Sequence, residues 1–205
     1  ASEYALVGGA QTTCFSNSLS CETESASAST SVSALVVPTG LLSLWKFDAT
    51  SYTAGSPGEV LDTQGISSGT TSGTVQSVPG KMGKAAQTDA TSDKITVTST
   101  SAYTSLSQGS FSFTGWFFSG TDKDAIVIAL HACTTSTGFI FQSKSGCYFG
   151  GVNAIGDAAI SPNHNNNVWH HFACVKDGTS YREYIDGALY ETETGPSTFT
   201  TPAEP

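Results

Sequence analysis

Short segments of alternating apolar and polar residues recur along the chain from residue 41 onwards. A period of two is typical of strands that bury one face, and short continuous apolar runs suit strands that are buried on both faces. Gly, Pro, Asn and Asp residues, which favour turns, separate these segments. The pattern predicts strands at 41–47, 93–98, 110–119, 125–133, 139–141, 147–152, 169–176 and 180–185. It predicts no helix of several turns.

Turn signals connect several of these strands into hairpins. Asp177-Gly178 and Asp186-Gly187 each separate two apparent strands, and Asp-Gly is a strong signal for a two-residue hairpin turn. A Ser/Thr/Gly turn between 125–133 and 139–141 indicates a further hairpin. The sequence therefore predicts an all-β fold, an antiparallel two-sheet β-sandwich.

The first 39 residues differ from the rest of the chain. They contain no Lys or Arg and consist largely of Ser, Thr, Ala, Glu and Asn, so they cannot bury enough apolar area to form a core alone. Two short apolar segments, 4–7 and 33–37, look like strands that need a host sheet. The alternative is a linker or a frayed terminus. We expect an extended tail over residues 1–39 and a sandwich domain over 40–205.

Charge limits the partners of this chain. Eight Lys and Arg residues face 17 Asp and Glu residues, which gives a net charge of −9. A phosphate backbone or an anionic membrane surface attracts cationic proteins, so neither is an expected partner. The sequence also has no apolar run near the roughly 20 residues of a membrane span, so membrane insertion is not expected.

Several segments resemble, in order, the laminin-G-like modules of the concanavalin A-like jelly-roll superfamily. They are Gly40–Asp48 (GLLSLWKFD), Val78–Ala85 (VPGKMGKA), 89–97, Gly109–Trp116 (GSFSFTGW), Trp169–Gly178 (WHHFACVKDG) and Tyr184–Gly187 (YIDG). The resemblance spans roughly residues 40–195 and implies that the sandwich is a jelly roll.

The resemblance also implies a missing strand. These modules continue after the equivalent of Thr194 with a closing strand that pairs with the first, whereas this chain ends at Pro205. A missing strand exposes unpaired backbone groups beside an apolar groove, and such an edge accepts another strand. The tail supplies strand-like segments. It can return to its own groove and give a monomer, or enter a neighbouring copy and give a head-to-tail polymer.

We favour polymerisation, and predict a structural subunit of an extracellular filament or surface fibre built by donor-strand exchange. Its partner is another copy of itself. The residues predicted to act in assembly are Tyr4, Leu6, Val7, Leu35 and Val37 in the tail and Leu42, Leu44 and Trp45 at the groove edge.

The alternative is a secreted carbohydrate-binding or adhesion module without catalysis. Aromatic rings stack on sugar faces, and Trp169 and Tyr148 are the main candidate glycan contacts, with Tyr103 as a further one. Trp45 and Trp116 lie where the family packs its core, so we expect both to be buried.

We do not expect an enzyme. The related glucanases place closely spaced carboxylates on one strand, and this sequence has no such Glu-x-Asp-x-x-Glu arrangement. It also has neither a Gly-x-Ser-x-Gly motif nor a phosphate-binding loop.

Five cysteines suit an extracellular or cell-surface protein. The candidate disulfide pairs are Cys14 with Cys21 and Cys133 with Cys147, while Cys174, within an apolar strand, is expected to be a buried free thiol. The chain begins at Ala1, so we expect that any signal peptide has been removed.

No cofactor is predicted, although calcium is a candidate, because laminin-G-like modules often hold Ca²⁺ through carboxylates and carbonyls. The candidate ligands are Asp48, Asp62, Asp89 and Asp93, and ordinary capping of turns is the favoured alternative for them. The Ser/Thr-rich stretches Ser25–Ser33 and Ser197–Pro202 suit O-glycosylation, whereas the sequence has no Asn-x-Ser/Thr site.

Overall fold

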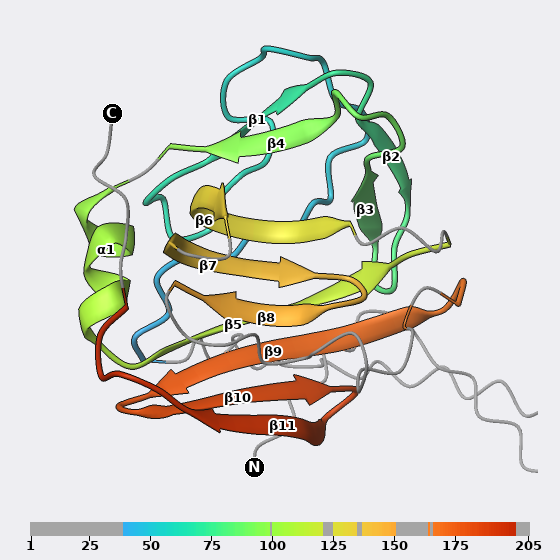
Figure 1. Cartoon of the computed structure of the whole chain (residues 1–205). Helices are drawn as coiled ribbons and strands as arrows, with labels where there is room; N and C mark the ends of the chain where they lie inside the picture. The colour runs from blue at the N-terminus through green and yellow to red at the C-terminus, as the bar shows by residue number, and fades with distance from the viewer. Residues whose placement is uncertain are drawn as a thin grey trace, which may run out of the picture. The chain divides into compact units, whose positions relative to one another are not determined.

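The computed structural model describes residues 39–98, 100–120, 125–134, 137–150, 164 and 166–199 (Figure 1). For residues 104, 130–134 and 137 it describes the backbone alone. The tail predicted over 1–39 lies outside the described residues except for Thr39, and so do its assembly residues Tyr4, Leu6, Val7, Leu35 and Val37 and the cysteines Cys14 and Cys21. The boundary of the tail and its role remain predictions.

The described chain consists of short strands and one short helical segment. The elements are β1 (Gly69–Ser72), β2 (Gln76–Pro79), β3 (Lys84–Gln87), β4 (Lys94–Val97), α1 (Ser101–Thr104), the 3-10 turn η1 (Ser105–Gln108), β5 (Phe111–Phe118), β6 (Ile126–Thr134), β7 (Thr137–Gln142), β8 (Gly146–Phe149), β9 (Trp169–Asp177), β10 (Ser180–Ile185) and β11 (Ala188–Thr194).

All strand pairs are antiparallel, and two sheets dominate (Figure 1). One has the order β11-β10-β9-β5 and the other has the order β6-β7-β8, while β1 pairs with β4 and β2 with β3. The predicted Asp-Gly hairpins join β9 to β10 and β10 to β11, and the hairpin predicted from residue 125 is β6 and β7. The prediction of an all-β antiparallel jelly-roll sandwich is confirmed.

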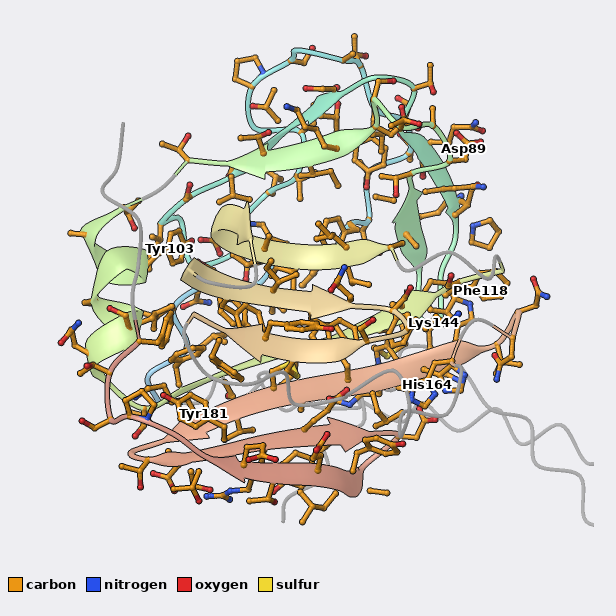
Figure 2. All side chains as sticks on the ribbon, in the orientation of Figure 1. Asp89, Tyr103, Phe118, Lys144, His164 and Tyr181 are labelled. Atoms are coloured by element: carbon orange, nitrogen blue, oxygen red, sulfur yellow. A yellow bond between two sulfur atoms is a disulfide. The ribbon has the colours of Figure 1, made fainter. Side chains whose placement is uncertain are left out.

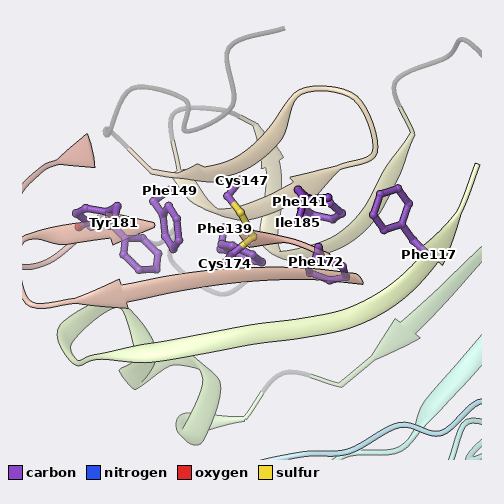
Figure 3. Packing of buried hydrophobic residues seen from close by; sticks show 10 residues of the cluster. Phe117, Phe139, Phe141, Cys147, Phe149, Phe172, Cys174, Tyr181 and Ile185 are labelled. Carbon is purple, nitrogen blue, oxygen red and sulfur yellow. A yellow bond between two sulfur atoms is a disulfide. The ribbon is translucent and has the colours of Figure 1, made fainter. Parts of the chain in front are cut away.

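Aromatic side chains from the two larger sheets form the core (Figure 3). Phe139 and Phe141 of β7 and Phe149 of β8 meet residues of β5, β9 and β10. The rings of Phe141 and Phe172 stack with centroids 4.0 Å apart. Full burial of one such side chain stabilises the fold by about 1.5–3 kcal/mol, so this cluster fixes the packing of one sheet on the other.

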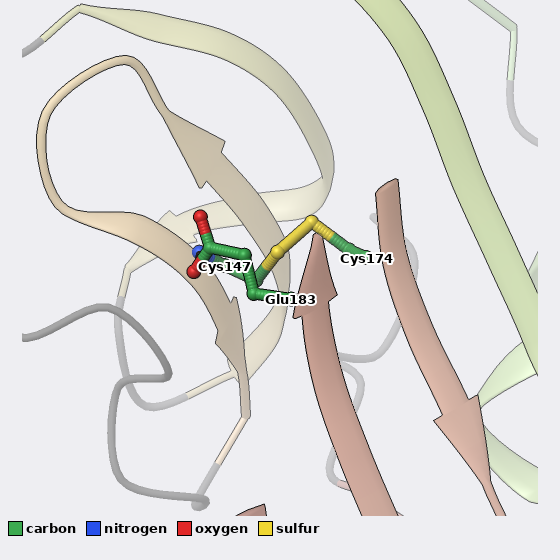
Figure 4. Close-up of a disulfide and its surroundings, with 3 residues drawn as sticks. All are labelled: Cys147, Cys174 and Glu183. Atoms are coloured by element: carbon green, nitrogen blue, oxygen red, sulfur yellow. Dashed lines mark hydrogen bonds between the residues drawn. A yellow bond between two sulfur atoms is a disulfide. The ribbon is translucent and has the colours of Figure 1, made fainter. Parts of the chain in front are cut away.

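A disulfide joins β8 of one sheet to β9 of the other, between Cys147 and Cys174 (Figure 4). The prediction that Cys147 forms a disulfide is confirmed, but its predicted partner Cys133 and the predicted free thiol at Cys174 are wrong. Both bonded cysteines are fully buried between the sheets.

The strand register explains why Cys133 is not the partner. Cys147 lies opposite Phe141, which in turn lies opposite Ile128 of β6. Cys133 is five residues further along β6, roughly 16 Å at the rise of an extended strand. The facing β9 offers Cys174 within a Cα separation of 6.0 Å.

The strand predicted at 41–47 is not a continuous strand. Within the described residues it makes one β-bridge, between Trp45 and Asp62. The backbone N–H of Leu44 donates to the Asp62 carboxylate at 3.0 Å, and the Leu44 carbonyl accepts from Thr63 N at 3.0 Å. The positive φ of 57° at Phe47 ends the extended backbone. A hydrogen bond to the Asp62 side chain and a turn at Phe47 therefore take the place of the backbone hydrogen bonds that a continuous strand would make.

The segment after β11 packs against the core. Phe199 is 4% exposed, and its N–H donates to the Ser107 carbonyl at 3.3 Å. The buried ammonium of Lys176 donates to Ser197 O at 2.6 Å and to Gly109 O at 2.8 Å. Lys176 thus links the start of β5 to the residues that follow β11.

Candidate binding surface

Large aromatic side chains lie on the outer face of the four-stranded sheet. Along β5 the side chains alternate, so that Phe117 is buried against the core while Trp116 and Phe118 are 39% and 49% exposed. Trp116 lies opposite His171 of β9, and Phe118 lies opposite Trp169. We call these four outward residues, Trp116, Phe118, Trp169 and His171, the aromatic strip.

The rings of the aromatic strip contact one another in pairs. The centroids of Phe118 and Trp169 are 5.7 Å apart, and those of Trp116 and His171 are 5.3 Å apart with the rings close to perpendicular. Such tilted and edge-to-face contacts between aromatic rings are favourable. The two pairs lie two residues apart along the strands, roughly 7 Å, so the strip presents a short row of rings on a sheet.

Polar groups flank the aromatic strip. The ammonium of Lys81, which follows β2, lies 4.9 Å from the centre of the Trp116 ring. Burial lowers the pKa of His171, and the nearby Asp186 only partly offsets this effect, so at pH 7 its imidazole is neutral. The strip therefore combines exposed apolar rings with a cation and a neutral imidazole.

A tight backbone approach supports one end of the strip. A Cβ on Gly120 would clash with the Asn167 amide oxygen and would lie 3.8 Å from the Phe118 ring. The loop before β9 thus packs against the residues that follow β5, and the N–H of Asn167 donates to Ser119 O at 3.1 Å. Phe118, the last residue of β5, is labelled in Figure 2. Val168, in the same loop, is 53% exposed.

The structure separates the predicted glycan contacts. Trp169 is half-buried within the aromatic strip, whereas Tyr148 is half-buried on β8, a strand of the other sheet. The further candidate, Tyr103, is 4% exposed, and its hydroxyl lies 2.6 Å from the Ser43 hydroxyl, so it is a packing residue and not a surface contact.

The expected burial of the other two tryptophans is not observed in full. Trp116 is an exposed residue of the aromatic strip, so its prediction as a core residue is wrong. Trp45 is half-buried, and its indole N–H donates to the Ser67 carbonyl at 2.9 Å. Sequence reasoning missed Phe118 altogether, although its place in the β5 alternation marks it as outward-facing.

Three of the four candidate calcium ligands, Asp48, Asp62 and Asp93, cap turns through their carboxylates. The Asp62 carboxylate accepts hydrogen bonds from the backbone N–H groups of Leu44, Gln64, Ile66 and Ser67. Burial alone would raise the pKa of Asp62, but the hydrogen bonds from Leu44, Gln64 and Ser67, with one from the Ser43 hydroxyl, lower it to about 2. Asp93 accepts from Thr74, Asp89 and Ala90, and its pKa is also about 2. Asp48 accepts from Lys84 N.

These hydrogen bonds use the carboxylate oxygens that a hard cation would need. Among the residues that the structure describes, no three or more His, Cys, Asp or Glu side chains form a group that could hold a metal ion by themselves. Capping of turns accounts for Asp48, Asp62 and Asp93.

One carboxyl group in the core, that of Glu183, has a raised pKa. Glu183 of β10 is fully buried beside the disulfide (Figure 4). Burial, with a smaller effect of Glu191, raises its pKa to about 7, although the N–H of Cys147 donates to its Oε2 at 3.4 Å. A raised pKa is typical of catalytic acids. This group has no exposed surface on which a substrate could meet it, so we interpret it as structural.

A comparison with protein-family models agrees with the β-sandwich fold described above. No described helix is both long enough and apolar enough to cross a membrane. No curated protein matches the chain. The laminin-G model described as the concanavalin A-like lectin/glucanases superfamily matches residues 89–205, more than half of the sequence. Domains of this type are usually extracellular, and the buried disulfide fits that environment. The chain therefore belongs to the concanavalin A-like lectin/glucanases superfamily, as a β-sandwich module of the laminin-G type.

Proposed function

We propose that this protein is a non-catalytic extracellular adhesion module that binds carbohydrate through its aromatic strip. The observation that carries the proposal is the outward exposure of Trp116 and Phe118, at 39% and 49%, on a sheet whose other face is a packed core. Large apolar side chains that remain exposed in a cluster commonly mark binding sites.

The chemistry of the strip suits sugar rings. The C–H face of a pyranose is apolar and packs on a flat aromatic ring, while its hydroxyls need hydrogen-bond partners at the edge. Lys81 supplies donors beside Trp116, and the neutral His171 supplies one donor and one acceptor. The strands β5 and β9 hold the rings of the aromatic strip in place before binding, which reduces the ordering cost.

A glycan array probed with the labelled full chain tests this proposal. We expect binding to a subset of glycans and at least a tenfold loss of affinity in Trp116→Ala and in Phe118→Ala. Leu61→Ala is the matched control, because Leu61 is 69% exposed and lies outside the strip. Absence of binding to every glycan, or equal loss in the control, would contradict the proposal.

A second candidate function is the filament subunit that assembles by donor-strand exchange. It is supported by the segment 41–47, where Leu42, Leu44 and Trp45 are only half-buried and, within the described part of the chain, one β-bridge to Asp62 is made. The contacts of Leu44 with Asp62 and Thr63 occupy part of that edge and count against it.

Negative-stain imaging and size-exclusion chromatography of the full chain test the filament. Donor-strand assembly predicts polymers that disappear when residues 1–37 are deleted. A homogeneous monomer with unchanged stability after that deletion would exclude it, without affecting the carbohydrate proposal.

A further inference from the structure

Two histidines, one amide and one carboxylate meet beside the beginning of β9. His170 Nδ1 lies 2.7 Å from Asp186 Oδ2, and His170 Nε2 lies 3.1 Å from Asn166 Oδ1. The side chain of His170 is 12% exposed. His164, labelled in Figure 2, has its ring centroid 5.0 Å from that of His170.

The hydrogen bonds of His170 are mismatched for a neutral ring. A neutral imidazole has one N–H and one lone pair, but here each ring nitrogen faces an oxygen that accepts. The orientation of Asn166 is fixed, because its Oδ1 also accepts from Val168 N at 3.1 Å. Asp186 is likewise fixed, since its Oδ1 accepts from His171 N at 2.9 Å. Both contacts are satisfied if the ring carries a second proton, or if a cation lies between His170 Nε2 and Asn166 Oδ1.

The buried His164 favours the cation. It is 7% exposed, and its Nε2 is a buried atom without a hydrogen-bond partner. An imidazole nitrogen without a hydrogen-bond partner offers a lone pair to a metal, and the imidazole nitrogen is the commonest metal ligand in proteins. A buried polar atom without a partner is rare in native proteins and calls for an occupant.

The spacing of the rings matches two nitrogens on one metal. With metal–nitrogen bonds of about 2.1 Å, the ring centroids of two ligating histidines are separated by roughly 4.6 Å at a 90° angle and roughly 5.3 Å at a tetrahedral angle. The observed separation is 5.0 Å. The 3.1 Å between His170 Nε2 and Asn166 Oδ1 is likewise a normal edge between two ligands of one ion.

We propose that His164, His170 and Asn166 bind a divalent transition-metal ion, with Asp186 as the carboxylate that orients His170. The pair of Asp186 and His170 is the carboxylate–histidine arrangement that fixes the ligand tautomer in many metal sites. Imidazole ligands favour Zn²⁺, Cu²⁺ and Ni²⁺ over Ca²⁺. Water completes the coordination shell. The ion would fasten the loop before β9 to the turn between β10 and β11.

Isothermal titration of the full, oxidised chain with Zn²⁺ at neutral pH tests this site, with Ca²⁺ as the comparison ion. We expect one Zn²⁺ per chain and no heat from Ca²⁺. His164→Phe and His170→Gln should each weaken Zn²⁺ binding at least tenfold, and Asp186→Asn should weaken it by about 10–100-fold. Asp177→Asn is the control, because Asp177 lies at the opposite end of β9, where it pairs with Arg182, and its exchange should leave the affinity unchanged.

A spectroscopic measurement separates metal binding from loss of folding. Cu²⁺ bound to the wild-type chain should show coupling to two imidazole nitrogens in its electron paramagnetic resonance spectrum, and His164→Phe should show one. Far-ultraviolet circular dichroism confirms that each variant is folded. Absence of Zn²⁺ binding, or wild-type affinity in the doubly substituted His164→Phe/His170→Gln chain, would overturn the proposal and leave a doubly protonated His170 as the explanation.

Discussion

Phe118 and Trp169 lie directly opposite each other on β5 and β9, with ring centroids 5.7 Å apart, and both face away from the core. The next outward pair along these strands is Trp116 and His171. The sheet therefore buries one row of aromatic rings and presents another on its outer face. Under the proposed function, this second row is the surface that contacts carbohydrate.

The outer rings should contribute little to stability. Trp116→Ala should change the free energy of unfolding by about 1 kcal/mol or less, because the ring is exposed and leaves no cavity. Phe141→Ala, which removes a ring that is 1% exposed, should cost about 3–5 kcal/mol. Urea denaturation monitored by circular dichroism compares the two variants. Similar losses would mean that Trp116 belongs to the core.

The disulfide should make a large contribution to stability. Cys147 and Cys174 are 27 residues apart, and closing a loop of this size stabilises a fold by about 3–4 kcal/mol in the chain-entropy model. The double variant Cys147→Ala/Cys174→Ala should lower the free energy of unfolding by that amount, as measured by urea denaturation. Cys133→Ala is the control. An unchanged transition in the double variant would show that the two sheets do not need this bond.

Glu183 should make the protein more stable in acid than at neutral pH. Its pKa in the folded state is about 7, above the ordinary value of 4.5 for a glutamate. A raised carboxyl pKa contributes stability that is complete below the unfolded value and is lost as pH rises through the folded value. The loss between these two values is on the order of 3 kcal/mol.

The variant Glu183→Gln isolates this effect. It keeps the shape of the side chain but cannot ionise, so its stability should exceed that of the wild-type chain above pH 7 and fall less steeply over the window between the two pKa values. Denaturation curves across that window measure the difference, which also cancels the opposite contribution of His164 and His171. Parallel pH profiles for the two chains would contradict the assignment.

Lys176 should hold the segment after β11 in place. Lys176→Met keeps the apolar stem but removes the ammonium that donates to Gly109 O and Ser197 O. Two charge-assisted hydrogen bonds are lost, so we expect a destabilisation of about 2–4 kcal/mol. Hydrogen exchange should show faster exchange at the Phe199 amide. Tyr181→Phe, which removes one hydrogen bond to Pro196 O, should have a smaller effect.

The sequence alone could predict the hairpins and the fold class, because these depend on local turns and on a period of two. The same alternation places Trp116 on the side of β5 opposite Phe111, Phe113 and Gly115. The prediction of its burial came from the family's usual packing and overrode that parity. For Trp116, the alternation along β5 indicates the correct side of the sheet, and the resemblance indicates the wrong one.

Contacts between sheets could not be predicted from pairing rules. The disulfide bond between Cys147 and Cys174 depends on how β8 faces β9, and these two strands belong to different sheets. The contact between His170 and Asp186 lies within one sheet, where Asp186, in the hairpin turn after β10, reaches His170 through the register of β9 and β10. The sequence indicated the Asp186-Gly187 turn, but it did not indicate that His170 lies beside Asp186.

The most direct test of the account is a titration of the strongest glycan from the array into the wild-type chain, Trp116→Ala, Phe118→Ala and Leu61→Ala. The account predicts that the two strip variants lose at least tenfold in affinity while all four chains keep nearly the same stability and Leu61→Ala binds as the wild type does. Wild-type affinity in both strip variants would contradict it.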